Sequence, residues 1–546
     1  KKLKNTLTKK LYFLSFFLYK KQSKFLSRTY RKPIKSLLQV SYNHFESVFT
    51  KAGGMLQMKN RRLLQFSLFL GVLYGIFLSV SIDACTTVLV GKNASVDGST
   101  MIARNEDLNT AWSKYFVVRK ENTNPSHFVS KGNGFTLDLP KEQLKYTATP
   151  EWDTSEGLFE EDGINSKNVA MSATESATTK EEILKKDPYT AHGIAEESML
   201  TVTLPYIDSA RAGVERLGKI VAKQGAAETN GVIFSDKNEI WYMEILSGHQ
   251  WAAVKVPDDC YAVIPNMLSI DSFDLKDKDS YLCSADLESF LEKNQLINTK
   301  RDISLRDIFA DKSKDEEYNL PRIWDAQRKL TPSKKQKITD RSFEMFVKPD
   351  KPISIAETAY IMTLHFNGTE YDTIEGTKPD KYRPISVPNT MESHILQIRN
   401  NVPEEISGIH WLALGIPDTS NYIPFYSNIS ETPEAYQKGT DMPDDISAYW
   451  TYRLTNILTK PYYSDFKKNI TLPTRQKVRD HLSKELASTD QQARELIVNH
   501  PEKLTDYLNQ KTQSFADYAI DAYQKMNQEL IVKMSEKTAT HHDKDL

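Results

Sequence analysis

Residues 85–90 read Cys85-Thr86-Thr87-Val88-Leu89-Val90, and residues 100–104 read Thr100-Met101-Ile102-Ala103-Arg104. The first run is apolar and rich in β-branched residues, and the Asp-Gly-Ser sequence at residues 97–99 is a turn signal between the two runs. This pattern predicts a β-hairpin. The hairpin would place Cys85 and Arg104 near the same edge of a sheet.

The residues before Cys85 have the pattern of an export signal. From Met58 the chain shows a basic start, an uncharged stretch over residues 63–82 and then the small residue Ala84. We therefore predict a signal peptide over residues 58–84 that is cleaved after Ala84. The leader is of a bacterial type, and the protein is expected to be secreted or held at the cell surface.

Two alternatives for this leader stay open. The apolar stretch is about as long as a membrane span, so the segment could remain as an uncleaved anchor. The sequence Ile82-Asp83-Ala84-Cys85 also loosely resembles a lipoprotein processing site, although Asp83 fits that pattern poorly. In that case Cys85 would carry lipid, and the protein would be a surface lipoprotein or binding module. Any membrane contact would come through the leader or the lipid.

Residues 1–57 begin with Lys, are strongly basic and show no clear link to the rest of the chain. We interpret them as an upstream or non-native extension. A basic segment that touches a membrane is the alternative.

Cleavage after Ala84 would give Cys85 both a thiol and a free α-amine. A model thiol has a pKa of about 8.5 and an α-amine one of about 7.7 to 8.0, so near neutral pH the amine can accept the thiol proton. Nucleophile and base then belong to one residue, which is the chemical basis of N-terminal-nucleophile hydrolases. The pattern favours a hydrolase of amide bonds. A nearby Arg104 would favour the thiolate, and Asp107 would orient the amine.

The composition is that of a folded globular protein, with 546 residues of which 39% are hydrophobic and 26% charged. The 71 basic and 72 acidic residues leave a net charge of -1, which gives no electrostatic case for nucleic acid or acidic membranes as partners. Three cysteines are too few for a disulfide framework, so Cys260 and Cys283 would either pair or stay as ordinary thiols. None of the 11 histidines forms a zinc-type HExxH cluster, and we expect no metal or organic cofactor.

Beyond the hairpin the chain mixes strands and helices. Hairpin material is expected over residues 145–149 and 163–173, and strands over residues 231–235, 240–246, 251–256 and 261–264. A helix is expected over residues 206–223, where apolar residues recur at helical spacing before Gly225. We predict a mixed α/β protein with antiparallel sheets, made of one domain over residues 85–444 and a helical C-terminal part over residues 445–546 packed on it.

Cys85-Thr86-Thr87 followed by Ala103-Arg104-Asn105-Glu106-Asp107 resembles the opening of the bacterial cysteine dipeptidases related to dipeptidase A, within the N-terminal-nucleophile superfamily. Their wider relatives, penicillin V acylases and bile salt hydrolases, share the Cys and Arg-Asn-x-Asp arrangement. Further stretches similar to the dipeptidase branch are residues 163–165, 169–175, 239–244, 247–252, 256–259, 370–372 and 383–386. The resemblance covers nearly all of the chain after residue 84.

The resemblance implies a fold and a reaction. The fold would be of the α+β class, an αββα sandwich of N-terminal-nucleophile type with a helical C-terminal part. The reaction would be hydrolysis of dipeptides or very short peptides through a thioester on Cys85, with an Asn266 amide that stabilises the oxyanion. The implied catalytic residues are Cys85, Arg104, Asp107, Asn266 and, as a weaker candidate, Arg322.

Some features of the sequence leave alternatives open. The acylase-type asparagine near Val169 has no secure match, because Ala173 or Thr174 falls at that place. Glu244 would either support packing or recognise a substrate amine. An acylase that acts on non-peptide amides with the same residues is the alternative activity. The sequence does not decide whether the protein forms a homo-oligomer.

Overall fold

The computed structural model describes residues 85–108, 111–124 and 127–537, all of which fall within one compact unit. The predicted extension over residues 1–57 and the predicted signal peptide over residues 58–84 lie outside the described residues. Within the described part, no helix combines the length and the apolar character that crossing a membrane requires.

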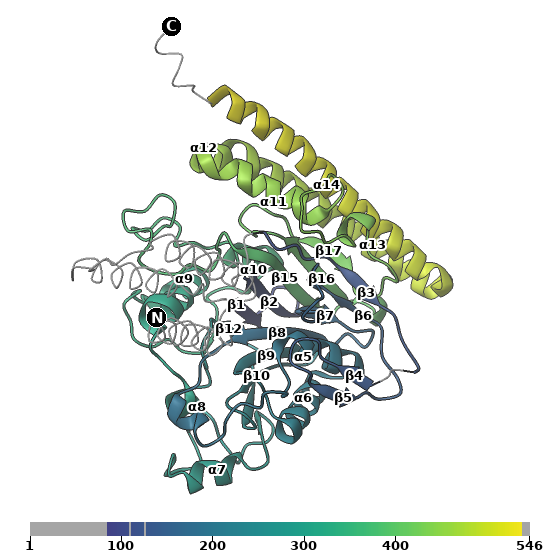
Figure 1. Cartoon of the computed structure of the whole chain (residues 1–546). Coiled ribbons are helices and arrows are strands. Elements are labelled where there is room, and N and C mark those ends of the chain that lie inside the picture. The colour runs from purple at the N-terminus through teal and green to yellow at the C-terminus, as the bar shows by residue number, and fades with distance from the viewer. Residues whose placement is uncertain (1–84, 109–110, 125–126, 538–546) are drawn as a thin grey trace, which may run out of the picture. The chain divides into compact units, whose positions relative to one another are not determined.

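Two antiparallel sheets form the centre of the described unit (Figure 1). The first has seven strands in the order β14 (Phe346–Val347), β12 (Tyr261–Ile264), β1 (Thr86–Val90), β2 (Thr100–Asp107), β15 (Thr390–Ile398), β16 (Gly408–Leu414) and β17 (Ile423–Tyr426). The second has six strands in the order β13 (Tyr281–Cys283), β11 (Trp251–Lys255), β10 (Ile240–Ile245), β9 (Asn230–Ser235), β8 (Ala170–Ser176) and β7 (Asp162–Ile164). Two small sheets pair β3 (Val117–Arg119) with β6 (Tyr146–Ala148) and β4 (His127–Val129) with β5 (Thr136–Asp138).

The predicted hairpin is confirmed. Strands β1 and β2 pair antiparallel with Thr87 opposite Arg104, so Cys85 and Arg104 lie at one edge. The second strand is longer than expected, because it runs on to Asp107, and all eight of its residues are buried. A strand with both faces buried can carry polar residues only if they find partners inside the protein. Arg104 and Asp107 are therefore expected to be paired with other buried groups.

Apolar side chains from both sheets meet in one core. Leu89 and Ile102 of the first sheet share a buried cluster with Ile233 and Tyr242 of the second. Strand residues alternate between the two faces of a sheet, so the neighbours Trp241 and Met243 belong to a different cluster, on the other face of the second sheet.

Helices α5 (Glu196–Thr203) and α6 (Ala210–Gln224) pack in that second cluster. The helix expected over residues 206–223 is confirmed with a later start: the Ser209 hydroxyl accepts a hydrogen bond from the amide of Ala212 and caps the first turn. Its end is marked by Gly225, whose φ of 78° is readily adopted only by glycine.

The C-terminal region is helical, as predicted. Helices α11 (Ala448–Thr459), α12 (Tyr463–Phe466), α13 (Leu472–Asn499) and α14 (Leu504–Lys537) are joined by short helical turns, and α11, α13 and α14 lie against β16 and β17 (Figure 1). The remaining helices are α4 (Glu181–Leu184), α7 (Leu287–Lys293), α8 (Leu305–Phe309), α9 (Leu320–Leu330) and α10 (Ile355–Ile361). A mixed α and β fold with antiparallel sheets is therefore confirmed.

Candidate active site

Cys85 lies immediately before β1, next to two strands that supply further candidate residues. Its side chain is buried, with 6% of the residue exposed. Strand β12 pairs with β1 so that Ile264 is opposite Thr87, and this register brings Asn266 level with Cys85. On the other side, β2 places Arg104 opposite Thr87. Two of the predicted site residues thus flank Cys85 because of strand pairing alone.

The Arg104 guanidinium contacts the thiol directly. Its Nη2 lies 3.5 Å from Cys85 Sγ and 2.7 Å from Glu161 Oε2, while Nη1 donates to the carbonyl of Ala173 at 2.6 Å. Arg104 is fully buried and Glu161 is 1% exposed, so this ion pair is shielded from solvent. A guanidinium beside a thiol favours the thiolate, and Glu161 and Ala173 hold that guanidinium in place.

Arg322, on the first turn of α9, contacts the backbone of the nucleophile. Its Nη1 donates to the Cys85 carbonyl at 2.5 Å and to Thr86 Oγ1 at 2.8 Å. Its Nη2 donates to Asn319 Oδ1 at 2.9 Å and to Asn266 Oδ1 at 3.0 Å. The residue that the sequence marked as a weaker candidate is therefore wholly buried at the centre of the site.

The contact with Arg322 fixes the orientation of the Asn266 amide. A guanidinium only donates hydrogen bonds, so the Asn266 atom that faces it must be the oxygen. Asn266 Nδ2 is buried and donates to no acceptor among the described residues. Buried donors are nearly always paired in native proteins. A donor left open beside a nucleophile can therefore bind an oxygen of a bound substrate.

Asp107 joins the site through a different set of contacts. Its Oδ2 accepts a hydrogen bond from Arg383 Nη2 at 2.5 Å, and its Oδ1 accepts one from Thr390 Oγ1 at 2.5 Å. Burial raises the pKa of the Asp107 carboxyl, while Arg383 opposes this rise. Asp107 is thus held by one cation and one hydroxyl group.

Glu244 supports the segment that follows Asn266. It lies on β10, is fully buried, and its Oε1 accepts hydrogen bonds from the backbone amides of Ser269 and Ile270. Burial raises the pKa of Glu244 to about 7. Because the two amides lie three and four residues after Asn266, Glu244 ties the second sheet to the loop that carries this asparagine.

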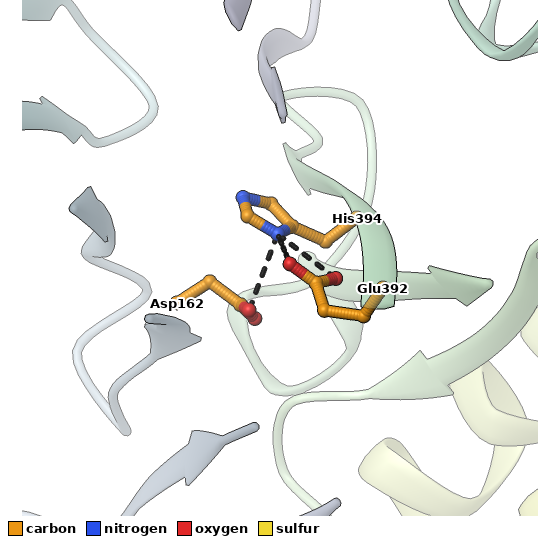
Figure 2. A group of neighbouring side chains, drawn as sticks. All are labelled: Asp162, Glu392 and His394. Carbon is orange, nitrogen blue, oxygen red and sulfur yellow. Dashed lines mark hydrogen bonds and ion pairs between the residues drawn. The ribbon is translucent and has the colours of Figure 1, made fainter. Parts of the chain in front are cut away.

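A second buried group of polar side chains connects the two sheets behind Arg104. His394 on β15, the strand partner of Arg104, places its Nδ1 3.0 Å from Glu392 Oε1 and 3.2 Å from Asp162 Oδ2, as Figure 2 shows. His394 Nε2 lies 2.9 Å from Ser172 Oγ, and His410 Nε2 lies 2.7 Å from Asp162 Oδ1. Burial lowers the pKa of His394, but the two carboxylates outweigh it and raise the pKa to about 9.

Two carboxylates and an imidazole are also ligands that divalent metals accept. Here the three residues already satisfy one another: the imidazole lies between both carboxylates, and Thr149 donates a hydrogen bond to Asp162. We interpret the group as a buried ion network. Since Asp162 follows Glu161 in the chain, two consecutive carboxylates bind Arg104 and His394 and so join the sheets at the site.

A comparison with known protein families identifies the family of the chain. A model of the family described as Peptidase family C69 matches residues 84–475, so the match begins one residue before Cys85. The chain belongs to peptidase family C69. It is a hydrolase of the peptidase class, and the resemblance to the bacterial dipeptidase A-like enzymes is confirmed.

Individual relatives carry dipeptidase names. A probable dipeptidase of Latilactobacillus sakei is 44% identical over 395 residues, which cover 71% of this chain and 84% of that protein. A probable dipeptidase B of Lactococcus lactis is 41% identical over 394 residues, covering 70% and 82% of the two chains. Dipeptidase A of Lactobacillus helveticus is 39% identical over 391 residues, covering 69% and 82%.

In this C69 chain, four of the five predicted residues are joined by direct contacts: Cys85, Arg104, Arg322 and Asn266. Asp107 is paired with Arg383, and the Tyr318 ring packs against the guanidinium groups of both Arg383 and Arg322. The Ala173 position, where an acylase-type asparagine was sought, contributes its backbone carbonyl to Arg104. Cys260 and Cys283 are free thiols.

Sequence reasoning missed Glu161 and Arg383. Glu161 belongs to an acidic run, Glu160-Glu161-Asp162, in a segment that otherwise reads as a buried hairpin. Such a run in an apolar context predicts buried ion pairs and could have marked it. Arg383 was noted only as part of residues 383–386, a stretch similar to the dipeptidases. Its partner Asp107 lies 276 residues away, and nothing in the sequence indicates that the two side chains pair.

Proposed function

We propose that the protein is an exported cysteine dipeptidase, which hydrolyses dipeptides or very short peptides through a thioester on Cys85. The observation that carries the proposal is the open Nδ2 donor of Asn266, held by Arg322 level with a thiol that touches Arg104. The dipeptidase names of the relatives support the substrate class. The proposed chemistry uses protein groups and water alone.

Maturation would create the base. In the unprocessed chain the Cys85 nitrogen is the amide that joins Ala84, which cannot accept a proton. Cleavage after Ala84, by a signal peptidase or by the chain itself, would free the α-amine, and its pKa near 8 suits it to take the thiol proton near neutral pH. Asp107 would then accept a hydrogen bond from this amine.

The reaction would proceed in two steps. The Cys85 thiolate attacks the scissile carbonyl carbon, and the carbonyl oxygen becomes an oxyanion that accepts a hydrogen bond from Asn266 Nδ2. The protonated α-amine returns its proton to the leaving nitrogen, the carbon–nitrogen bond breaks, and a thioester and a free amine result. Water, deprotonated by the same α-amine, then attacks the thioester carbonyl carbon. The carbon–sulfur bond breaks, the acyl part leaves as a free carboxylic acid, and the α-amine returns its proton to the thiolate.

The proposal includes an αββα sandwich of the N-terminal-nucleophile type. The buried cluster shared by the two sheets supports this arrangement, as do the helical clusters on their other faces, with α5 and α6 on the second sheet and α11, α13 and α14 on the first. In this fold the nucleophile begins a strand between the sheets, and Cys85 directly precedes β1.

A substrate panel tests the proposed function. We expect mature protein to hydrolyse unblocked dipeptides, and Cys85→Ala to abolish turnover while the far-UV circular dichroism stays unchanged; Cys260→Ser, at another buried thiol, is the matched control and should retain activity. Preferred hydrolysis of N-acylated or other non-peptide amides would show an acylase instead. A diacylglyceryl adduct on Cys85 in the exported protein would show a lipoprotein. Retained turnover in Cys85→Ala would refute the assignment of the nucleophile.

A further inference from the structure

Two arginines contact Cys85, and a third, Arg383, packs on the same Tyr318 ring as one of them; the three differ in exposure. Arg104 and Arg322 are fully buried and hold groups of the protein itself. The Arg383 side chain keeps 12% of its surface exposed, although it is paired with the wholly buried Asp107. Among these three cations, Arg383 is therefore the one that a bound substrate can reach.

Tyr318 connects Arg383 to the nucleophile. The Tyr318 ring centroid lies 5.0 Å from the Cζ atom of Arg322 and 5.5 Å from that of Arg383, so one aromatic ring packs against both guanidinium groups. Arg322 in turn touches the Cys85 carbonyl at 2.5 Å. Tyr318 belongs to the π-helical turn Asp315–Asn319 directly before α9, and such turns are frequent at functional sites.

A dipeptide carries a negative charge close to the bond that is cleaved. Its C-terminal carboxylate belongs to the residue that follows the scissile bond, so it lies only about 3.5 Å further along the chain than the carbonyl under attack. A tripeptide or a dipeptide amide has a neutral amide at the same place. Arginine suits this task because its planar fork has five N–H donors and can bind a carboxylate while it keeps another contact.

We propose that Arg383 binds the C-terminal carboxylate of the substrate and so restricts the enzyme to dipeptides. This inference rests on the proposed function, because it assumes that the scissile carbonyl lies at Cys85. Arg383 would keep Nη2 on Asp107 and Nη1 on the Pro384 carbonyl, and the substrate carboxylate would bind a further N–H of the same guanidinium. One side chain would thus contact both the carboxylate that orients the amine and the group that marks the end of a dipeptide. Tyr318 would keep the guanidinium in place.

The test compares a dipeptide with its C-terminal amide. We expect wild-type protein to prefer the free carboxylate, and Arg383→Gln to reduce the ratio of the two kcat/KM values by about ten- to hundredfold, the effect of losing a hydrogen bond to a charged group. Arg383→Lys keeps the charge without the fork and should retain part of the preference. The ratio does not depend on how much of the protein is folded.

Thr390→Val is the matched control, since Thr390 is the other hydrogen-bond donor to Asp107. It should lower kcat/KM for both substrates by the same factor and leave the ratio unchanged. An unchanged ratio in both Arg383 variants would overturn the inference, even if their activity falls. Should Arg383→Gln lose all activity, the ratio measured for Arg383→Lys decides between these outcomes.

The experiments distinguish a failure of the proposed function from a failure of the proposed role of Arg383. Turnover that persists in Cys85→Ala would remove the nucleophile, whereas an unchanged carboxylate preference in the Arg383 variants would leave the nucleophile intact and remove only this recognition role.

Discussion

Arg322 donates a hydrogen bond to Asn266 Oδ1 at 3.0 Å, and this contact leaves Asn266 Nδ2 as a buried donor with no acceptor among the described residues. The two residues come from a helix and from the end of a strand, and they are 56 residues apart in the chain. The geometry resembles an oxyanion site prepared before substrate arrives, which is the most effective way for a protein to stabilise developing charge.

Removing the Asn266 donor should slow catalysis with little effect on substrate binding. We expect Asn266→Ala to lower kcat by about 10²- to 10³-fold, as the loss of one oxyanion donor does, and to change KM little. Steady-state kinetics on a dipeptide measures both constants. Asn319→Ala, which removes a different hydrogen-bond partner of Arg322, serves as the control and should cost less. Equal losses in both variants would contradict an oxyanion role.

Cys85 should be the reactive thiol of the mature protein. Burial raises the pKa of Cys260 to about 11 and raises that of Cys283 above its usual value, so both thiols are protonated at neutral pH. Iodoacetamide at about pH 7.5, close to the ordinary α-amine pKa, should label Cys85 first, and activity should fall in proportion to labelling found by peptide mass spectrometry. Cys260→Ser should be inactivated at the wild-type rate. Preferential labelling of Cys260 or Cys283 would contradict this prediction.

Glu161 should control the Arg104 contact with the thiol. We expect Glu161→Gln to weaken the hold on the guanidinium and to lower the rate of Cys85 alkylation, while the overall fold persists. The pH dependence of alkylation, compared with that of wild-type protein, reports the change in thiolate stability. A pH profile that coincides with the wild-type profile would show that Glu161 has no such effect.

Two buried groups, Glu244 and His394, should each make the protein less stable as the pH rises. The pKa of Glu244 is raised from 4.5 to about 7, so its favourable contribution is complete below about pH 4.5 and is lost as the pH rises to about 7. The pKa of His394 is raised from 6.5 to about 9, so its contribution is complete below about pH 6.5 and is lost as the pH rises to about 9. Each shift corresponds to ~3 kcal/mol at most.

Denaturant unfolding at several pH values can separate the two groups. The loss of stability between about pH 4.5 and 7 should be smaller in Glu244→Gln, and the loss between about pH 6.5 and 9 should be smaller in His394→Gln. A variant that leaves its window unchanged would show that its group does not titrate there.

Some strands were predicted closely from their Val, Ile and aromatic residues. Strand β9 begins one residue earlier than the predicted range and ends with it, and β12 coincides with the prediction, because Val, Ile and aromatic residues fill them. Strand β15 was not predicted. Its sequence includes Glu392, Ser393 and His394, all fully buried, and polar residues inside a strand hide its hydrophobic pattern.

Contacts between residues far apart in the chain limit how much of the site can be predicted. Cys85, Arg104 and Asp107 could be proposed because they lie within 23 residues of one another on a hairpin. Arg322 and Asn266 entered only through the family resemblance. Glu161 and Arg383 become visible only in three dimensions, since an ion pair between distant segments leaves no periodic signal in one sequence.

N-terminal sequencing of the active enzyme tests the central claim most directly. The proposed mechanism predicts that the active species begins at Cys85 with an unblocked amine. An active protein that begins at another residue, or whose Cys85 amine is blocked, would contradict it.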